Sequence, residues 1–464
     1  MSIAEWVARY GTYPAHEWLC GRPTLRELRR LRQLADQPPE AVQRDAVERL
    51  RRLLRFAATH LPYYAEQFRE AGLDPDAPDI RTALNRLPVL SKDDVRAAGD
   101  QMLCKHVPGG PIPYRTGGTT GRALHFYLDR RQQAQRMAAR LFMQELFGVR
   151  VGDRRAYVWG SPIESVRGRL KRLRDRLINE VLLDAFDMSA DRVAAHLDRL
   201  RAFEPRVIYG YPSAIALLAE HIARRKQRWP YARPRLIVLT GEETLPEQRA
   251  KLQECFGCPV ATEYGSREMG VIAHECPQGR LHILTPHVLV EVLRDGRPAP
   301  PDKCGQIVAT ALNARAQPLI RYDLEDAGRL LPDFCPCGLP FPLLQLDGGK
   351  ITGLLALPGG RLCHGAVSSY VLRDEPGIIQ FKTYQRRIDW IEVLLVIDQR
   401  FSPRSIERIR QNYRRLIGPQ VRVDCRIVDQ IPPDPSGKRR HVVSEVVPDG
   451  GHFEIVRPTC AGKA

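Results

Sequence analysis

The sequence predicts an α/β protein: a large N-terminal domain of parallel βαβ sheets with a β-rich subdomain, then a small mobile α+β C-terminal domain. Strand-like and helical patterns alternate from residue 130 to 262, as in parallel sheets with crossover helices. Short alternating strands with Pro and Gly turns follow over 281–329, and Asp-Gly-Gly-Lys at 347–350 breaks the pattern. We therefore expect one domain over 1–347, with its β-rich part at about 281–346, and a second over 348–464.

The spacing of apolar residues predicts the elements in chain order. Residues 25–34 and 41–54 carry apolar side chains three and four apart, which predicts helices. Ser91 is a typical helix N-cap, because Asp94 follows three residues later. The other expected elements are helices over 130–147, 190–203, 214–225 and 403–416, and strands over 155–159, 207–209, 236–239, 259–262 and 421–428, with two more strands inside 378–397.

Length and composition indicate a soluble globular protein with more than one domain. A chain of 464 residues is too long for one compact core, and 43% hydrophobic with 27% charged residues is ordinary for a globular chain. No apolar run is long enough to span a membrane, and no charged-then-apolar leader stands at residues 1–13. We expect a cytoplasmic protein without membrane insertion. The sequence leaves the oligomeric state open, a homodimer included.

The net charge of +17 comes largely from arginines dispersed through helical patterns, for example over residues 167–176. A solvated helix face explains such a pattern better than a nucleic-acid surface, since no DNA- or RNA-binding motif accompanies it. An anionic ligand such as ATP or coenzyme A would still benefit from the positive field. We expect no nucleic-acid partner.

The most distinctive stretch is YRTGGTTGRALHF at residues 114–126. Glycines let backbone N–H groups turn toward an anion, and threonine hydroxyls add donors for phosphate oxygens. It is not the common P-loop, because no lysine follows the last glycine. Taken alone, an ordinary surface turn explains it equally well. The candidate phosphate-binding residues are Thr116, Gly117, Gly118, Thr119, Thr120 and Gly121.

Three further motifs follow predicted strands, and a fourth lies near the end of the chain. They are TGE at 240–242, EYGSREMG at 263–270, PLIRYDLED at 318–326 and DPSGK at 434–438. A carboxylate suits Mg²⁺, which takes one or two carboxylates plus phosphate oxygens, and it can also accept two hydrogen bonds from a vicinal diol. Each motif alone could be a plain turn with surface charges.

In order and spacing, the motifs together resemble those of the adenylate-forming superfamily, in particular its phenylacetate–CoA ligase and capsule-biosynthesis (CapK-like) branch. HLPYY at 60–64 and LPVLSK at 87–92 add to the resemblance, which covers most of the chain. It implies that Tyr264 lies along an adenine, that Glu268 holds Mg²⁺ and that Asp326 binds the ribose hydroxyls, with Asp323 as second choice. Lys438 would be the catalytic lysine. Gly241, Glu242, Gly265 and Ser266 complete the implied nucleotide site.

The resemblance implies that a carboxylic acid and ATP give an acyl-adenylate and pyrophosphate, and that a thiol, most often coenzyme A, then takes the acyl group. Two alternatives stay open. The acyl group or AMP could pass to an amine, a hydroxyl or a carrier protein, or the chain could bind nucleotide without turnover. Aromatic residues at strand ends are candidates for the acid pocket and equally for the core: Trp159, Tyr209 and Tyr211, with Pro212.

The sequence departs from the family pattern in several places. Gly117 stands where serine is usual, and Ala123 where proline is usual. Arg267 replaces threonine or serine beside the expected phosphates, with which a guanidinium can pair, so we expect it to act with Glu268 and Lys438 in catalysis. The hinge at 349–353 lacks the family's aspartates, so the thioester step is less firmly implied than adenylation.

A separate group of residues has the composition of a zinc site. Eleven cysteines in a chain without a leader favour thiols or metal ligands over disulfides. Three thiolates and one imidazole make a suitable tetrahedral set, and a similar cluster is seen in the resembling branch. We expect Cys276, His282, Cys335 and Cys337 to bind a structural zinc ion that fixes the β-rich subdomain.

Overall fold

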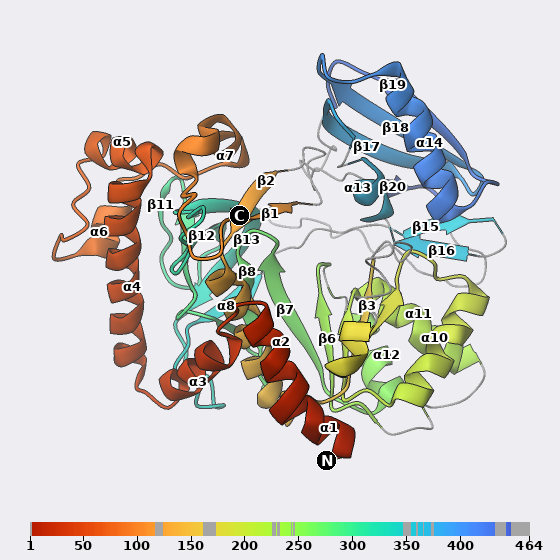
Figure 1. Cartoon of the computed structure of the whole chain (residues 1–464), viewed down its shortest axis with the longest axis horizontal. Helices are drawn as coiled ribbons and strands as arrows, with labels where there is room; N and C mark the ends of the chain where they lie inside the picture. Colours follow the sequence, from red (N-terminus) through yellow and green to blue (C-terminus); the bar gives the residue numbers. More distant parts are fainter. Residues whose placement is uncertain are drawn as a thin grey trace, which may run out of the picture. The chain divides into compact units, whose positions relative to one another are not determined.

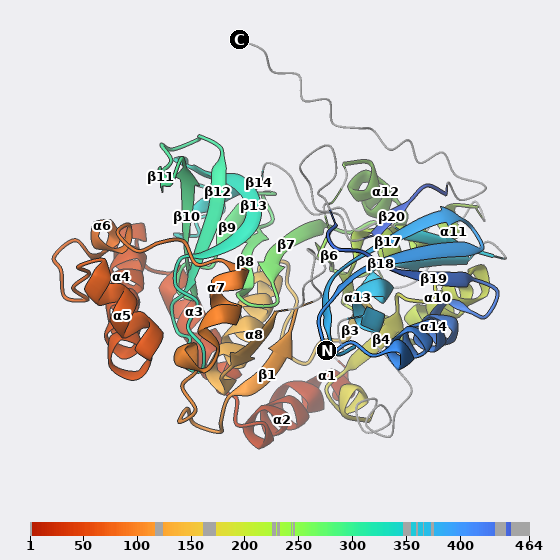
Figure 2. The same ribbon diagram turned by 90° about the horizontal axis from the view of Figure 1, so that it is seen from above.

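The structure is a computed structural model of the chain (Figures 1 and 2). It describes residues 2–116, 124–160, 173–224, 229, 233–242, 244, 246–346, 354–358, 361–364, 366–372, 375–431 and 442–446. Their contacts form two compact units. The large unit takes in most of residues 1–351, and the small unit takes in most of 352–464 together with Phe186–Arg192.

The large unit begins with a helical region, as the apolar spacing predicted. Its elements are α1 (Ile3–Val7), the π-helix η1 (Ala8–Thr12), α2 (Tyr13–Leu19), α3 (Thr24–Ala35), α4 (Pro39–His60), α5 (Pro62–Glu70), α6 (Ile80–Leu84), α7 (Lys92–Ala98) and the 3₁₀ helix η2 (Gly99–Met102). The predicted cap of α7 is confirmed: the Asp94 amide donates to the Ser91 hydroxyl at 3.1 Å, and the Ser91 amide donates back to the Asp94 carboxylate at 2.8 Å.

A twelve-stranded mixed sheet is the framework of the large unit. Its parallel part holds β3 (Arg155–Trp159), β4 (Glu180–Asp184), β5 (Val207–Gly210), β6 (Leu236–Thr240) and β7 (Val260–Ser266). The helices α8 (Arg130–Glu145), α10 (Ala190–Phe203), α11 (Pro212–Arg224) and α12 (Pro246–Phe256) complete this part. The expected alternation is therefore confirmed, although β4 was not predicted and β7 continues four residues beyond the expected end.

The β-rich part joins the same sheet through antiparallel strands and begins earlier in the chain than 281. In sheet order, β7 is followed by β8 (Gly270–Glu275), β9 (Leu281–Ile283), β14 (Leu343–Leu346), β13 (Tyr322–Leu331), β12 (Gly305–Ala311), β10 (Val288–Arg294) and β11 (Arg297–Pro298). Residues 263–266 extend β7 because they pair with β8. A separate ribbon pairs β1 (Ile112–Arg115) with β2 (His125–Leu128).

The small unit is the α+β element that the sequence predicted. Its elements are β15 (Leu354–Leu357), β16 (Arg361–His364), α13 (Ala366–Leu372), β17 (Ile378–Arg387), β18 (Trp390–Ile397), α14 (Pro403–Ile417), β19 (Arg422–Ile427) and β20 (Val442–Ser444). Four of the strands form a sheet in the order β19-β18-β17-β20. Ile409 and Tyr413 of α14 are fully buried in the core of this unit, together with Phe381 of β17.

Within the described part of the chain, no helix combines the length and the apolarity that crossing a membrane requires. None of the ten described cysteines forms a disulfide bond.

Candidate functional site

The described flanks of the glycine–threonine loop are held by backbone bonds. Gly117, Gly118, Thr119, Thr120 and Gly121 lie outside the described residues, as does Ala123. At the base of the loop, the Thr116 amide donates to the Leu124 carbonyl at 2.9 Å, and the Leu124 amide donates to the Thr116 hydroxyl at 2.8 Å. Thr116 thus closes the β1–β2 ribbon, and its binding of phosphate stays a prediction.

Arg267 connects this loop base to the turn that follows β7. Its guanidinium donates to the Arg115 carbonyl at 3.0 Å. Arg136 of α8 fixes the same turn, since it donates to the carbonyls of Arg267 (2.6 Å) and Glu268. Burial lowers the pKa of Arg136 to about 10, which leaves it charged at neutral pH. The loop base and the β7–β8 turn are therefore neighbours.

Two of the predicted nucleotide-binding residues, Gly265 and Ser266, lie in or beside the turn between β7 and β8, where each is needed for the turn itself. A Cβ at Gly265 would stand 2.2 Å from the Gly270 carbonyl oxygen, so the hairpin itself requires glycine. The Ser266 hydroxyl accepts a hydrogen bond from the Met269 amide at 3.0 Å. Both residues were expected to contact a nucleotide, and both have a structural task in this turn.

Tyr264 and Asp326, 62 positions apart in sequence, are directly hydrogen-bonded. The Tyr264 hydroxyl on β7 donates to Asp326 Oδ2 on β13 at 3.0 Å. Burial, and secondarily the Asp326 charge, holds the pKa of Tyr264 well above its usual value, so this phenol stays a donor. The competing Asp323 instead accepts from the Glu325 amide at 2.8 Å, within its own turn. The geometry therefore favours Asp326 over Asp323 as the partner of Tyr264.

Glu268 has a matching phenol partner. The Tyr322 hydroxyl donates to Glu268 Oε1 at 3.0 Å, and both side chains are buried. Burial, followed by the Glu268 charge, raises the pKa of Tyr322, which keeps this bond in the donor form. Tyr264, Glu268, Tyr322 and Asp326 form what we call the carboxylate corner.

LPVLSK at 87–92 runs beside this corner. Leu90 and Tyr322 form an isolated parallel bridge, and the Asp323 amide donates to the Leu90 carbonyl at 2.9 Å. Lys92 pairs with Glu325 at 2.6 Å. The early motif therefore supports the strand that carries Tyr322 and Asp326.

Gly241 and Glu242 follow β6, whose Thr240 pairs with Glu263 of β7, so they lie one strand from Tyr264. Gly241 has a φ of +82°, which favours glycine. The Glu242 carboxylate accepts from the Ser213 amide at 3.0 Å and from its hydroxyl at 3.1 Å. Glu242 thus stabilises the N-terminus of α11.

The aromatic candidates for the acid pocket divide into two kinds. Trp159 and Tyr211 stack with ring centroids 4.1 Å apart, beside Gly241. Tyr209 belongs to the core instead: its hydroxyl donates to Glu263 at 2.6 Å, and Arg140 lies over its ring at 4.4 Å. Pro212 is the first residue of α11. Trp159 and Tyr211 remain the better candidates.

The half-buried Arg140 of α8 forms an ion pair with the buried Glu263 of β7. Two guanidinium nitrogens of Arg140 donate to the two Glu263 oxygens, each at 3.1 Å. Burial alone would raise the pKa of Glu263, but Arg140 outweighs it and the pKa is lowered. This pair joins α8 to β7 directly before Tyr264.

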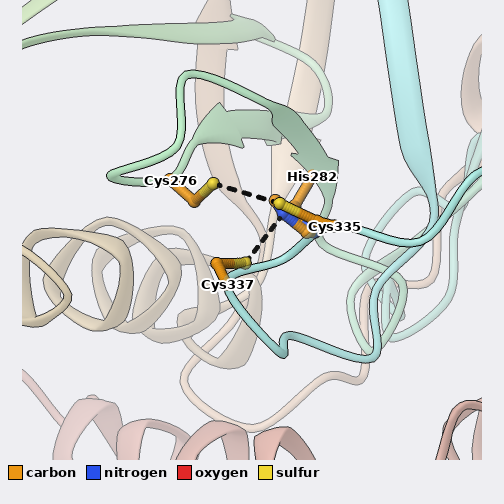
Figure 3. A group of neighbouring side chains, drawn as sticks. All are labelled: Cys276, His282, Cys335 and Cys337. Carbon is orange, nitrogen blue, oxygen red and sulfur yellow. Dashed lines mark hydrogen bonds between the residues drawn. The ribbon is translucent and has the colours of Figure 1, made fainter.

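The predicted cysteines and histidine gather at the other end of β8 and β13 (Figure 3). Their four ligand atoms lie within 4.8 Å of one another. Cys276 Sγ is 3.6 Å from Cys335 Sγ, and Cys337 Sγ is 3.3 Å from His282 Nε2. The His282 Nδ1 atom lies 3.0 Å from the Phe341 carbonyl oxygen, which orients Nε2 toward the sulfurs. We call Cys276, His282, Cys335 and Cys337 the cysteine cluster.

The cysteine cluster fits a tetrahedral zinc ion. Sulfur ligands about 2.3 Å from zinc stand about 3.8 Å apart, close to the observed sulfur separation. Cys276, His282 and Cys335 are buried, as expected of a structural site without an open position. Cys255 and Cys258 lie outside this group, and burial raises the pKa of Cys258 to about 12.

Sequence reasoning missed three partners of the predicted residues: Tyr322, Arg136 and Ser213. Tyr322 stood inside the quoted motif, and its phenol could have been proposed as a donor to a carboxylate. Arg136 and Ser213 gave no signal, because their roles depend on which turn packs against them. Lys438 lies outside the described residues, as do residues 349–353 of the hinge.

Known proteins are similar to this chain over most of its length. Residues 355–445 match the CapK C-terminal domain family. The chain is 23% identical to protein CapK of Staphylococcus aureus over 402 residues, which is 83% of this chain and 85% of that protein. It is 27% identical to a phenylacetate-coenzyme A ligase of Pseudomonas putida, covering 68% of this chain and 71% of that protein. A Thermus thermophilus phenylacetate-coenzyme A ligase is 24% identical over 89% of this chain and 98% of that protein.

Among solved structures, the 2-hydroxyisobutyryl-CoA ligase with 2-HIB-AMP and CoA in the thioesterification state has a TM-score of 0.59 at 20% identity. The match covers 89% of this chain and 91% of that one, and it shows a shared fold. The resemblance expected from the motifs is confirmed: the chain is similar to CapK over most of its length and to phenylacetate-coenzyme A ligases over two thirds or more of it, which supports the adenylate-forming, CapK-like branch.

Proposed function

We propose that this protein activates a carboxylic acid with ATP as an acyl-adenylate and then transfers the acyl group to the thiol of coenzyme A. The observation that carries the proposal is the carboxylate corner: Tyr264 bonded to Asp326, and Tyr322 bonded to Glu268. The relatives named as phenylacetate-coenzyme A ligases support the same reaction class.

The corner can contribute binding and orientation. Asp326 Oδ2 accepts a hydrogen bond from the Tyr264 hydroxyl, and a carboxylate is a suitable acceptor for the two hydroxyls of a ribose. Glu268 would hold Mg²⁺, which would neutralise phosphate charge when bound. Arg267, at the base of the glycine–threonine loop, is positioned to pair with a phosphate oxygen.

In the first step, a carboxylate oxygen of the acid bonds to the α-phosphorus of ATP, and the bond from that phosphorus to the bridging oxygen breaks to release pyrophosphate. In the second, the thiol sulfur bonds to the acyl carbon, loses its proton, and AMP leaves. Negative charge builds on the phosphoryl oxygens in the first step, where the ammonium of Lys438 would stabilise it.

The test is ATP–pyrophosphate exchange with a library of carboxylic acids, with Lys438→Ala as the control. Acid-dependent exchange that is lost in Lys438→Ala supports the proposal. Lack of exchange with every acid and metal condition would refute it and favour a nucleotide-binding protein without turnover. AMP release that requires coenzyme A would separate this acceptor from an amine, a hydroxyl or a carrier protein.

We also propose a structural zinc ion in the cysteine cluster, on the basis of its donor set and spacing. Its role would be to fasten the loop after β13 to β8 and β9, at a distance from the reaction. Metal analysis of the purified protein should give one zinc per chain. A metal-free protein of unchanged stability would contradict this assignment.

A further inference from the structure

The N-terminal helices carry an apolar surface that the catalytic proposal does not use. In the described part of the large unit, nine large apolar side chains are exposed, and eight of them lie in residues 3–19 and 173–177. Helical residues 173–177 adjoin η1, because the Thr12 hydroxyl donates to the Leu177 carbonyl. We call this set the N-terminal face: Ile3, Trp6, Val7, Tyr10, Trp18, Leu19, Leu173 and Leu177.

The exposure of this face is large, and it is rich in aromatic residues. Trp18 is 79% exposed, Trp6 is 55% exposed and Tyr10 is 62% exposed. Trp6 and Tyr10 pack on each other with ring centroids 5.6 Å apart, one helical turn apart on α1 and η1. Figures 1 and 2 show α1 and α2 on the outer side of the helical region. Scattered exposed apolar residues are normal, but such a concentration marks an interaction surface.

Exposed arginines border the N-terminal face, whereas the nearby carboxylates are buried and paired. The two carboxylates within residues 2–23, Glu5 and Glu17, are both buried and paired with arginines. Arg176 is exposed beside Leu177, and Arg26 is exposed on α3. The uncharged aromatic surface is therefore bordered by cations.

A hollow of about 870 Å³ opens beside Tyr10, between η1, α2, α3 and the segment after α8. Four arginines and a single carboxylate line it. That carboxylate, Glu145, accepts two hydrogen bonds from Arg32, and Arg9 is paired with Asp153 at 2.9 Å. Among the described residues, the guanidinium groups of Arg29 and Arg150 have no ion-pair partner. The hollow can therefore accept an anionic group.

We propose that the N-terminal face docks this protein onto the surface of a bilayer that contains anionic phospholipids. Trp6, Tyr10 and Trp18 would enter the interfacial region, where indole and phenol rings are favoured. Arg29 and Arg150 would take a lipid phosphate in the hollow beside Tyr10. This is peripheral binding, and it requires no helix that crosses the membrane.

The charge around the N-terminal face favours a bilayer over a second copy of the chain as its binding partner. In a two-fold symmetric dimer through this face, each copy would present the same cationic border to the other, and like charges would repel. An anionic bilayer complements both the border and the hollow. The face thus fits lipid better than itself.

The first experiment measures co-sedimentation of the full chain with vesicles of phosphatidylcholine, with and without phosphatidylglycerol, over a range of salt. Binding should require phosphatidylglycerol and weaken as salt rises. Arg29→Glu/Arg150→Glu should lower the partition coefficient about 30-fold, since each cation contributes about a factor of five near an anionic surface. The matched control is Arg294→Glu/Arg297→Glu on β10 and β11, which changes net charge equally and should bind nearly as the parent does.

The second experiment removes the aromatic anchors. Trp6→Ala/Trp18→Ala should reduce vesicle binding at least about tenfold, whereas Ile427→Ser, at another exposed apolar side chain, should not. In the unaltered protein, phosphatidylglycerol brominated on its acyl chains should quench tryptophan fluorescence, a readout that needs no variant to fold.

Several outcomes would overturn the proposal. Vesicle binding that is absent, that ignores phosphatidylglycerol, or that falls equally in the control variants would exclude this face as a lipid-docking surface. A dimer that dissociates in Trp6→Ala/Trp18→Ala, without lipid binding by the parent, would assign the face to self-association instead.

Discussion

The carboxylate corner and the cysteine cluster lie at opposite ends of the same strands, and they differ in the kind of ligand atoms that they bring together. β8 begins next to Glu268 and ends next to Cys276, while β13 begins at Tyr322 and leads toward Cys335. In the corner, two carboxylates each accept a hydrogen bond from a phenol. In the cluster, all four donor atoms converge on one point. The first arrangement suits an exchangeable ligand, and the second a permanent one.

The largest expected effect comes from removing the ribose acceptor. Asp326→Ala should lower the kcat/KM for ATP in pyrophosphate exchange by at least about 100-fold, because two hydrogen bonds to a charged group are lost. Asp323→Ala is the matched control, since the Asp323 carboxylate accepts its hydrogen bond from the Glu325 amide within its own turn and the substitution leaves the backbone bond to Leu90 in place, and it should stay within about threefold of the parent. If the two variants were equally impaired, the assignment of Asp326 would be wrong.

Removal of one cluster ligand should affect stability before activity. Cys335→Ser should lose zinc and lower the melting temperature by about 10 °C, because metal binding stabilises the folded state. Cys304→Ser, at an exposed thiol outside the cluster, should keep both. Metal analysis and thermal unfolding read out the two effects separately. A Cys335→Ser protein with full zinc content would contradict the ligand set.

The ion pair between Arg140 and Glu263 should affect how the free energy of unfolding changes with pH in acid. The pKa of Glu263 is lower in the folded protein than in the unfolded chain, so its contribution to stability is full above about pH 4.5 and is lost as pH falls through the folded pKa. Glu263→Gln should cost about 2 kcal/mol at neutral pH, because the partly buried Arg140 loses its charged partner. Its free energy of unfolding should change less steeply with pH below about 4.5 than that of the parent. Identical acid profiles, measured by denaturant unfolding, would show that the pair contributes nothing.

The smallest effect is expected at Tyr322. Tyr322→Phe removes the phenol that donates to Glu268 and should cost about 1 kcal/mol of stability. The Mg²⁺ concentration for half-maximal exchange should also shift, by about two- to fivefold. Tyr63→Phe, at a half-buried tyrosine outside the corner, should shift neither value. An unchanged Mg²⁺ response in Tyr322→Phe would separate Glu268 from the metal.

The sequence predicted the residues of the corner and of the cluster better than it predicted their hydrogen-bond partners. The resemblance of the motifs to a known family selected Tyr264, Glu268 and Asp326, whose roles stay predictions, and residue types, spacing and the same resemblance selected the cysteine cluster. The partners were harder, because the Tyr322–Glu268 bond depends on how β13 and the β7–β8 turn meet in the folded sheet. Gly265 illustrates the same limit: it was attributed to a ligand, and the Gly270 carbonyl already requires a glycine there.

Calorimetric titration can show whether the carboxylate corner binds a nucleotide through its ribose hydroxyls, as we propose. ATP and 2′,3′-dideoxy-ATP are titrated into the parent protein and into Asp326→Asn. The parent should bind ATP at least about 30-fold more tightly than the dideoxy nucleotide, and Asp326→Asn should lose most of that preference. Equal affinity of the parent for both nucleotides would contradict the account.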